Sequence, residues 1–355
     1  MSNVKKITGH KMFLPVFCMI LVLCINVFYD VAQGNAFYDF FKISITNDLL
    51  SGRLVNILNR GSEVSILAVG MTLVVSASAG TDISVGSVMA LCASVCCVIL
   101  AGPAAPQATE LAAPLIVGVL GAVIMGCVCG ALNGGLVAYL NIQPMVATLI
   151  LWTAARAIGL LVCNNLIVYV RNDTFGILGG YVGFFPTPII IAAIVIAAAA
   201  LVLKLTAMGM YVQSVGINKK ASRIAGLNSK QIIFICYLIC GVCASIAGVV
   251  ASSRITSADS NNIGLNCELD AILAVALGGN SLGGGKFNLA GSVIGAYTIQ
   301  AITTTMYNMG VSSAVAPVFK AIVVIIIVAI QAPPVKAWFK KLGARRAAQK
   351  EVVRV

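Results

Sequence analysis

The sequence predicts an all-α, polytopic membrane protein with about ten transmembrane helices. The chain has 355 residues, of which 60% are hydrophobic and only 10% are charged. Soluble domains carry about 25% charged residues, and the mean hydropathy of +1.01 agrees with a membrane protein. At about 20 residues per span plus loops, the length allows about ten crossings. This composition excludes a disordered chain, a coiled coil and a soluble enzyme with an ordinary solvated surface.

Ten apolar runs are the candidate spans. They are residues 12–29, 62–79, 84–101, 113–139, 145–163, 188–205, 231–251, 267–282, 288–308 and 317–333. The first run follows a basic start, as a signal peptide does, but its length and the later spans favour a retained helix. The run 267–282 is short and glycine-rich at its end, so it either spans or re-enters. Residues 30–60 and 164–187 are expected to form external loops.

Basic residues gather in three segments beside apolar runs: the tail 1–11, the segment 206–230 and the tail 334–355. The positive-inside rule places all three in the cytoplasm. Six predicted crossings separate the first two segments and four separate the last two, so both termini are expected inside. We therefore expect a transmembrane permease domain at 12–333 between two cytoplasmic tails. A net charge of +12 can indicate nucleic acid, but this placement favours the lipid bilayer as partner.

Small residues predict close helix packing at two places. Gly126, Gly130 and Gly134 are four residues apart, which leaves one helix face with almost no side chain. Gly291 and Gly295 repeat this spacing. These patterns predict packing and say nothing about a substrate.

Ionisable groups inside apolar runs are costly and indicate function by default. The candidates are Glu63, Asp82, Arg156, Glu268, Asp270 and Lys320. Glu63 and Lys320 lie near predicted span ends, where they can reach the interface, and Arg156 could pair with a carboxylate. Glu268 and Asp270 are two residues apart and do not share a helix face.

Asp82 has the best position for a functional role, because the segment 80–84 interrupts apolar sequence on both sides. Such a break is tolerated where protein or a water-filled cavity covers the backbone. One interpretation is that the Asp82 carboxylate caps the next helix. The other is that it lines a pathway. We take Asp82, Ser84, Ser87, Asn133, Glu268 and Asp270 as candidates for a pathway or helix break.

Catalytic and metal-binding motifs are missing from the sequence. His10 is the only histidine, so no Ser–His–Asp or Cys–His arrangement is expected. The glycine-rich stretch 278–286 fails as a P-loop, because Asn280 stands where the first glycine is required and Phe287 follows the lysine. The twelve cysteines lie almost all in apolar runs, and small buried hydrophobic residues are a better interpretation than a thiol or zinc site. We expect no catalytic residues, no metal and no cofactor bound by this chain.

The segment 206–230 is too polar to span a membrane. In it, Gly216 and Gly226 bracket a short expected helix with apolar residues on one side and basic residues on the other. Such a helix suits a membrane surface or a groove on a partner protein.

The sequence resembles the membrane permease subunit of bacterial sugar ABC importers of the ribose and galactofuranose type. The resemblance lies in ILAVGMTLVV (66–75), GTDISVGSVMA (80–90), IQPMVATLIL (142–151), GMYVQSVGINKKASRIAGLN (209–228) and residues 258–296. These stretches keep their order and spacing over most of residues 54–330. The stretch 258–272 together with FNLAGSVIGA looks closest to the galactofuranose branch.

The resemblance implies the type II importer architecture, with two permease subunits, identical or paralogous, around one pathway in the bacterial inner membrane. It implies an ABC ATPase subunit that uses ATP and a periplasmic sugar-binding protein as partners. The coupling helix of the family would fall at about 215–226 and insert into a groove of the ATPase. The residues assigned to coupling are Gly216, Asn218, Ala221, Arg223, Ala225 and Gly226.

One departure from the family concerns the break. The family usually has two glycines and then an isoleucine or leucine before the aspartate, whereas this chain has Ala79, Gly80 and Thr81 before Asp82. The departure puts the identity of the sugar in doubt more than the fold.

Two other functions compete with the importer subunit. An ion-coupled secondary transporter could use Asp82, Glu268 or Asp270 as a proton or sodium site, but it predicts inverted repeats, and the two halves show none. A membrane-embedded enzyme would need a nucleophile and base that the sequence lacks.

Overall fold

The computed structural model describes residues 12–34, 39–46, 48–102, 107–312, 315, 317–322 and 325. The predicted tails 1–11 and 334–355 lie outside these residues, and so does most of the predicted span 317–333. The chain divides into two compact units, Met1–Ala301 and Ile302–Val355. In the second unit, the described residues are 302–312, 315, 317–322 and 325. The first unit contains the candidate site residues of the break and of the segment 206–230.

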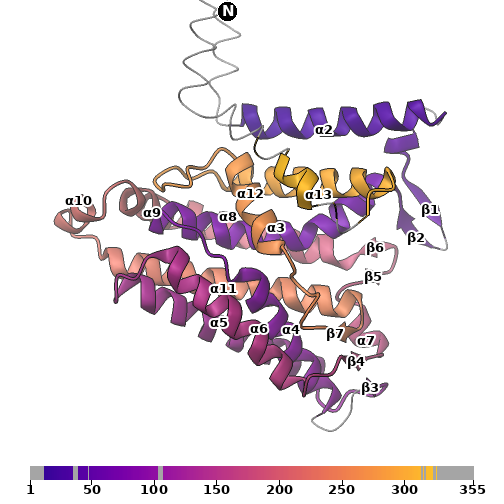
Figure 1. The fold of residues 1–355 in the computed structure, drawn as a ribbon, viewed down its shortest axis with the longest axis horizontal. Coiled ribbons are helices and arrows are strands. Elements are labelled where there is room, and N and C mark those ends of the chain that lie inside the picture. The colour runs from indigo at the N-terminus through magenta and orange to yellow at the C-terminus, as the bar shows by residue number, and fades with distance from the viewer. Residues whose placement is uncertain are drawn as a thin grey trace, which may run out of the picture. The chain divides into compact units, whose positions relative to one another are not determined.

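Helices make up most of the described chain (Figure 1). They are α2 (Phe13–Ala32), α3 (Arg53–Ser78), α4 (Val85–Ala101), α5 (Leu115–Ala138), α6 (Pro144–Val162), α7 (Asp173–Gly176), α8 (Thr187–Leu205), α9 (Met208–Ile217), α10 (Lys219–Ile224), α11 (Ser229–Arg254), α12 (Cys267–Leu277) and α13 (Leu289–Asn308), with a 3₁₀ turn η1 (Asp39–Phe41). The strands are β1 (Ser44–Thr46), β2 (Leu49–Ser51), β3 (Gln107–Ala108), β4 (Val168–Val170), β5 (Tyr181–Val182), β6 (Phe185–Pro186) and β7 (Ser257–Ala258).

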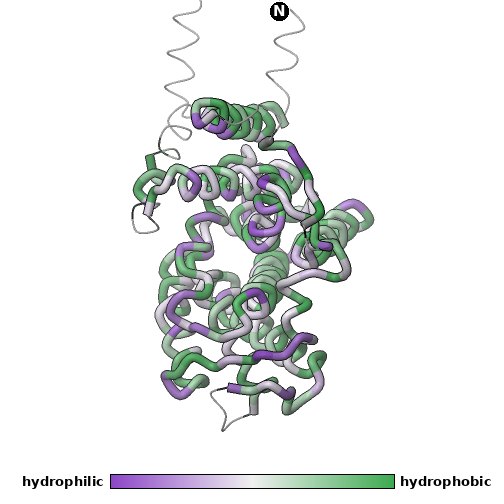
Figure 2. Tube along the Cα trace, turned by 90° about the vertical axis from the view of Figure 1, so that its right-hand side faces the viewer, coloured by the Kyte–Doolittle hydropathy of each residue, from purple (hydrophilic) through white to green (hydrophobic). Residues whose placement is uncertain are grey.

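Within the described residues, six helices are long and apolar enough to cross a membrane: α2, α3, α5, α6, α8 and α11. Helix α4 is a shorter apolar helix of 17 residues. Most helix ends lie within three residues of the predicted spans, because the apolar runs are long and end at polar or turn residues. Figure 2 shows that hydrophobic residues dominate the helices. The chain is therefore a multi-pass, helical membrane protein.

One sequence prediction about the spans needs correction, and the structure bears on the choice between spanning and re-entering for the run 267–282. Helix α12 has only 11 residues, a length of about 16 Å, so it cannot cross a hydrocarbon core of about 30 Å by itself. The predicted external loop 30–60 is also too long, because α3 already begins at Arg53. The Arg53 side chain forms an ion pair with Asp30 near the end of α2, which gives both charges a partner.

The core lies where α3, α4, α5 and α11 pack together, and α3 is buried over nearly its whole length. Helix α8 contributes few buried residues. The described parts of α5 and α6 also leave one face of each helix exposed, with large apolar residues such as Ile124 and Ile150 on it. These outer faces suit lipid or a second subunit.

The predicted small-residue faces are confirmed as packing surfaces. A Cβ atom on Gly126 would lie 2.4 Å from the carbonyl oxygen of Gly241, and one on Gly130 would lie 2.5 Å from that of Tyr237. Helices α5 and α11 therefore meet backbone to backbone. A Cβ atom on Gly291 of α13 would lie 2.3 Å from the carbonyl oxygen of Gly278, and one on Gly295 would lie 2.2 Å from that of Ala274.

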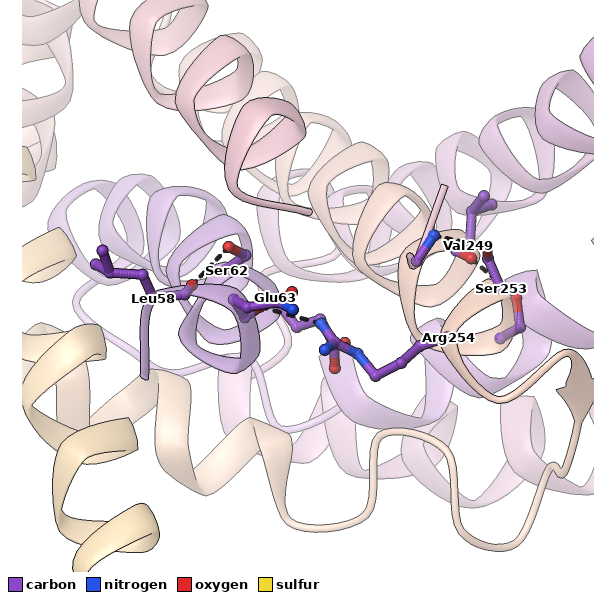
Figure 3. A network of polar contacts seen from close by, with 9 residues as sticks. Leu58, Ser62, Glu63, Val249, Ser253 and Arg254 are labelled. Carbon is purple, nitrogen blue, oxygen red and sulfur yellow. Dashed lines mark hydrogen bonds and ion pairs between the residues drawn. The ribbon is translucent and has the colours of Figure 1, made fainter. Parts of the chain in front are cut away.

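Buried polar contacts hold one end of α11. Arg254 Nε donates to Glu63 Oε1 of α3 at 2.9 Å, and Arg254 Nη2 donates to the carbonyl oxygen of Asn59 (Figure 3). Glu63 thus has a structural partner, which the sequence prediction of an interfacial side chain missed. Nearby, β4 pairs with β3 in parallel and with β7 in antiparallel orientation. Helices α9 and α10 lie at the opposite end of α11 (Figure 1).

Candidate functional site

The break between α3 and α4 centres on a buried carboxylate. Helix α3 ends with Ala79 in the left-handed conformation at φ 56°, and α4 begins at Val85. The side chain of Asp82 is 4% exposed, and its Oδ1 accepts hydrogen bonds from Ser84 N at 2.9 Å and Ser84 Oγ at 2.6 Å. A carboxylate at a helix N-terminus satisfies free N–H groups and meets the positive end of the helix dipole. Both of these hydrogen bonds come from the residue two positions ahead, and Ser84, the N-cap of α4, makes no side-chain capping bond. The capping and the pathway interpretations both stay predictions.

Two other helices close over this break. Asn133 of α5 donates from Nδ2 to Ser84 Oγ at 2.8 Å, and the Ile83 N–H donates to Thr148 Oγ1 of α6 at 3.2 Å. Asn133 Oδ1 and Ser87 Oγ are buried and have no hydrogen-bond partner. The structure thus brings Asp82, Ser84 and Asn133 together and leaves polar atoms beside them with unused hydrogen-bonding capacity.

A second carboxylate reaches the same turn of α4 from α12. Glu268 is 5% exposed, and its Oε1 accepts a hydrogen bond from Trp152 Nε1 of α6 at 3.3 Å. Its Oε2 is buried without a partner and lies 2.1 Å from the place where a Cβ on Gly86 would be. Asp82 and Glu268 therefore both lie at the first turn of α4. Sequence reasoning missed Trp152, although a tryptophan in the middle of a predicted span was a signal.

The other intramembrane candidates have different surroundings. Asp270 is buried in the first turn of α12, two residues after Glu268. Arg156 donates from Nη1 to the carbonyl oxygens of Asn261 and Ile263, and to that of Ser260. These hydrogen bonds go to the backbone of the loop before α12, and not to a carboxylate as the sequence predicted. Arg156 therefore holds an irregular segment against α6.

The polar segment 206–230 contains two helices instead of the single predicted helix at 215–226. The helix is interrupted at Asn218, whose backbone is extended at φ −156°, ψ 101°. Its Oδ1 accepts hydrogen bonds from Lys220 N and Ala221 N, both at 3.0 Å. Asn218 is therefore the N-cap of α10, which begins at Lys219. Gly216 lies inside α9 and does not begin a helix.

Helix α9 packs against the end of α3. Val212 and Val215 are fully buried. A Cβ on Gly216 would lie 1.8 Å from the carbonyl oxygen of Ser76 and 2.6 Å from the backbone nitrogen of Gly285. Gly285 N also donates to the Ser76 carbonyl at 3.1 Å. The glycine-rich stretch 278–286 is therefore a close-packed turn joining α9, α3 and α12, as the failed P-loop match indicated.

Helix α10, by contrast, is exposed. Ile224 is 89% exposed, and Ala221, Arg223 and Ala225 are exposed as well. Desolvation lowers the pKa of Lys219 from its ordinary value. Gly226 has φ +85°, and a Cβ atom added to it would meet no atom within 4 Å. A groove of about 420 Å³ lies between the end of α10 and the start of α11. It is lined by Arg223, Gly226, Leu227, Asn228, Ser229 and Lys230.

Cysteines and metal ligands add no further site. In the described parts of the chain, no group of three or more His, Cys, Asp or Glu side chains could hold a metal ion. The cysteines are free thiols, and most of them are buried. Cys240 and Cys243 of α11 lie against Gly70 of α3, which agrees with a packing role.

Comparison with known proteins identifies the family. Residues 53–330 match the family of the permease component of the branched-chain amino acid transport system. The chain is 41% identical over 293 residues to the galactofuranose transporter permease protein YtfT of Escherichia coli, covering 82% of this chain and 83% of the relative. It is 34% identical to the fructose import permease protein FruF of Bifidobacterium longum, covering 97% and 94%. It is 37% identical to the ribose import permease protein RbsC of Escherichia coli, covering 78% and 84%. No solved structure matches the chain.

The chain belongs to this permease family and resembles in particular its sugar-importing members. It is a transport subunit and not an enzyme, because the relatives are permease subunits of transporters.

Proposed function

We propose that this chain is the transmembrane permease subunit of an ATP-driven importer that moves a monosaccharide, such as galactofuranose or ribose, across a bacterial inner membrane. The names of the relatives support a sugar as cargo. The proposed partners are an ABC ATPase subunit, a second permease subunit, identical or paralogous, and a periplasmic sugar-binding protein. Both termini, 1–11 and 334–355, are proposed to lie in the cytoplasm.

The observation that carries the proposal is the structure of the segment 206–230. Helix α10 exposes its surface, whereas α9 makes a backbone contact with the end of α3 through Gly216. A partner that pushes on α10 can therefore displace the end of α3, which continues into the break at Asp82. This arrangement suits coupling to a cytoplasmic ATPase, and Asn218, Ala221, Arg223, Ala225 and Gly226 form the proposed contact.

The proposed pathway follows the two carboxylates at the first turn of α4. Asp82 and Glu268 are buried among helices α4, α5, α6 and α12. Irregular backbone at membrane depth is tolerated where it lines a cavity or is covered by protein. We assign Ser84, Ser87, Asn133 and Asp270 to the same region. In this proposal the chain itself binds no cofactor or metal, and the partner ATPase uses the ATP.

The test is co-purification in detergent with the products of the neighbouring genes, followed by an ATPase assay. We expect a bound ATPase whose activity rises when the sugar-loaded binding protein is added. Proteoliposomes then compare uptake driven by internal ATP with uptake driven by a proton gradient. Uptake that needs the gradient and no ATPase would overturn the proposal and favour a carboxylate-coupled secondary transporter.

A further inference from the structure

Trp152 occupies an unusual depth for a tryptophan. It lies eight residues after Pro144 and ten before Val162 in α6, so about 12 Å and 15 Å of helix separate it from the two ends. Tryptophans of membrane proteins gather at the interfaces, where their amphipathic rings meet the headgroups. Trp152 is half-buried, and a packing role alone would be met by leucine. Its position near the middle of a span therefore needs a reason.

The indole N–H of Trp152 is held in place by Glu268. The Glu268 side chain is almost fully buried, with Oε1 bonded to the indole at 3.3 Å and Oε2 without a partner. Oε2 fits against α4 only because residue 86 is glycine, since a Cβ there would lie 2.1 Å away. Burying a carboxylate with an unpartnered oxygen costs free energy. This unfavourable burial occurs where the Glu268 carboxylate orients the indole ring of Trp152.

The loop that precedes α12 lies against α6 close to Trp152. Residues 259–266 form irregular backbone between β7 and α12. Arg156, one helical turn from Trp152, binds three carbonyl oxygens of this loop. Asn261 and Asn262 of the loop are exposed, and Asn262 Nδ2 donates to Asp259 Oδ2 at 2.6 Å. Irregular backbone inside a membrane protein is tolerated where protein covers it or where it lines a water-filled cavity, and an exposed amide beside it can bind a polar cargo.

We propose that Trp152 contacts the sugar during translocation and that Glu268 is the positioning residue that fixes its indole. A monosaccharide presents C–H groups on the faces of its ring and hydroxyl groups around the edge. The indole face suits the first, and the exposed amide of Asn261 suits the second. A mostly apolar surface with a few placed polar groups is typical of small-ligand sites. This inference rests on the proposed function and adds the residues that select the cargo.

The experiment uses the complete transporter in proteoliposomes, with radiolabelled D-ribose, D-fructose and D-galactose as probes. Trp152→Leu keeps apolar volume and removes the indole. We expect its uptake of the transported sugar to fall about tenfold, as one lost contact worth about 1.4 kcal/mol implies, with an altered preference among the three sugars. ATP hydrolysis stimulated by the loaded binding protein should stay within about twofold of wild type, because coupling does not pass through Trp152. Leu161→Ala, on the opposite face of α6 and 67% exposed, is the matched control and should transport normally.

Glu268 separates a positioning role from a proton-carrying role. Glu268→Gln keeps an oxygen acceptor for the indole and should retain most of the uptake, whereas Glu268→Ala should reproduce the Trp152→Leu sugar preference. Loss of uptake in Glu268→Gln with wild-type preference would overturn the positioning role.

The outcomes for Trp152 are equally distinct. Wild-type uptake and preference in Trp152→Leu would show that only apolar packing matters there and would overturn the inference. If Trp152→Leu fails to assemble, Trp152→Phe, which keeps an aromatic face, decides the question: unchanged uptake kinetics and preference would also overturn it. A wild-type complex without sugar-stimulated ATP hydrolysis would instead refute the proposed function itself.

Discussion

The two glycines of the polar segment, Gly216 and Gly226, look alike in the sequence and have opposite surroundings in the structure. Gly216 touches backbone atoms of α3 and of the glycine-rich turn, so there is no room for any side chain. Gly226 has open space around it and is constrained only by its left-handed backbone at φ +85°. One glycine serves a contact inside the subunit, and the other ends a helix at an exposed surface. The comparison separates the part of the segment that transmits movement from the part that meets a partner.

The largest effect is expected for Gly216→Val. A Cβ at 1.8 Å from a carbonyl oxygen cannot be accommodated without backbone movement, and overpacking of this kind costs about 1–3 kcal/mol or more. We expect a lower midpoint of thermal unfolding in detergent, measured by size-exclusion chromatography, and loss of uptake. Gly209→Ala in the same helix is the control, because its Cβ would lie 3.5 Å from the nearest atom. Equal stability of both variants would contradict the assigned contact.

The second prediction concerns Gly226→Arg. A side chain has space there, so the subunit should fold and insert with a strain of about 1 kcal/mol for the left-handed backbone. The added bulk and charge should block association with the ATPase and abolish uptake, as measured by pull-down and transport. Gly226→Ala introduces the strain without the bulk and should keep most of the uptake. Normal uptake in Gly226→Arg would refute the assignment of this surface to coupling.

The third prediction tests the break to which α3 leads. Asp82→Asn keeps an oxygen that can accept the Ser84 hydrogen bonds but removes the charge. We expect uptake to fall several-fold while the yield of inserted protein changes little, measured side by side in membranes. If the yield falls and uptake per molecule stays constant, Asp82 acts only as a helix cap.

The smallest effect is expected for Asn218→Ala. Loss of the N-cap should destabilise α10 by about 1 kcal/mol, which affects a short exposed helix and not the core. We expect uptake to fall about two- to threefold, with normal unfolding in detergent. Asn218→Asp keeps the acceptor oxygen and should stay close to wild type. A large loss of stability in Asn218→Ala would show that α10 packs more tightly than its exposure indicates.

Sequence alone predicted the spans well wherever a long apolar run ended at polar residues, as in α5 and α6. It predicted a break at residues 80–84, because polar residues interrupt apolar sequence there, and α3 and α4 are separate helices on either side. It placed the helix start at Gly216 wrongly, since the capping role of Asn218 depends on local backbone geometry. The short length and glycine-rich end of the run 267–282 were visible in the sequence, but the end of α12 at Leu277 was not, because hydropathy does not show where an apolar run stops being helical.

Contacts between distant residues could not be predicted. Trp152 and Glu268 are 116 residues apart, and Glu63 and Arg254 are 191 apart. Each pair depends on which helices become neighbours, and one sequence does not contain that information. The role of Gly86 follows only from the pair, since its missing side chain matters where Glu268 arrives.

The close seam between α5 and α11 limits how the subunit can move. Gly126, Gly130 and Gly241 let the two backbones touch, so a slide of one helix along the other would drive side chains into carbonyl groups. We therefore expect α5 and α11 to move as one rigid body during the transport cycle. Hinges are then expected at places without such a backbone contact, such as the break at Asp82 and the extended residue Asn218.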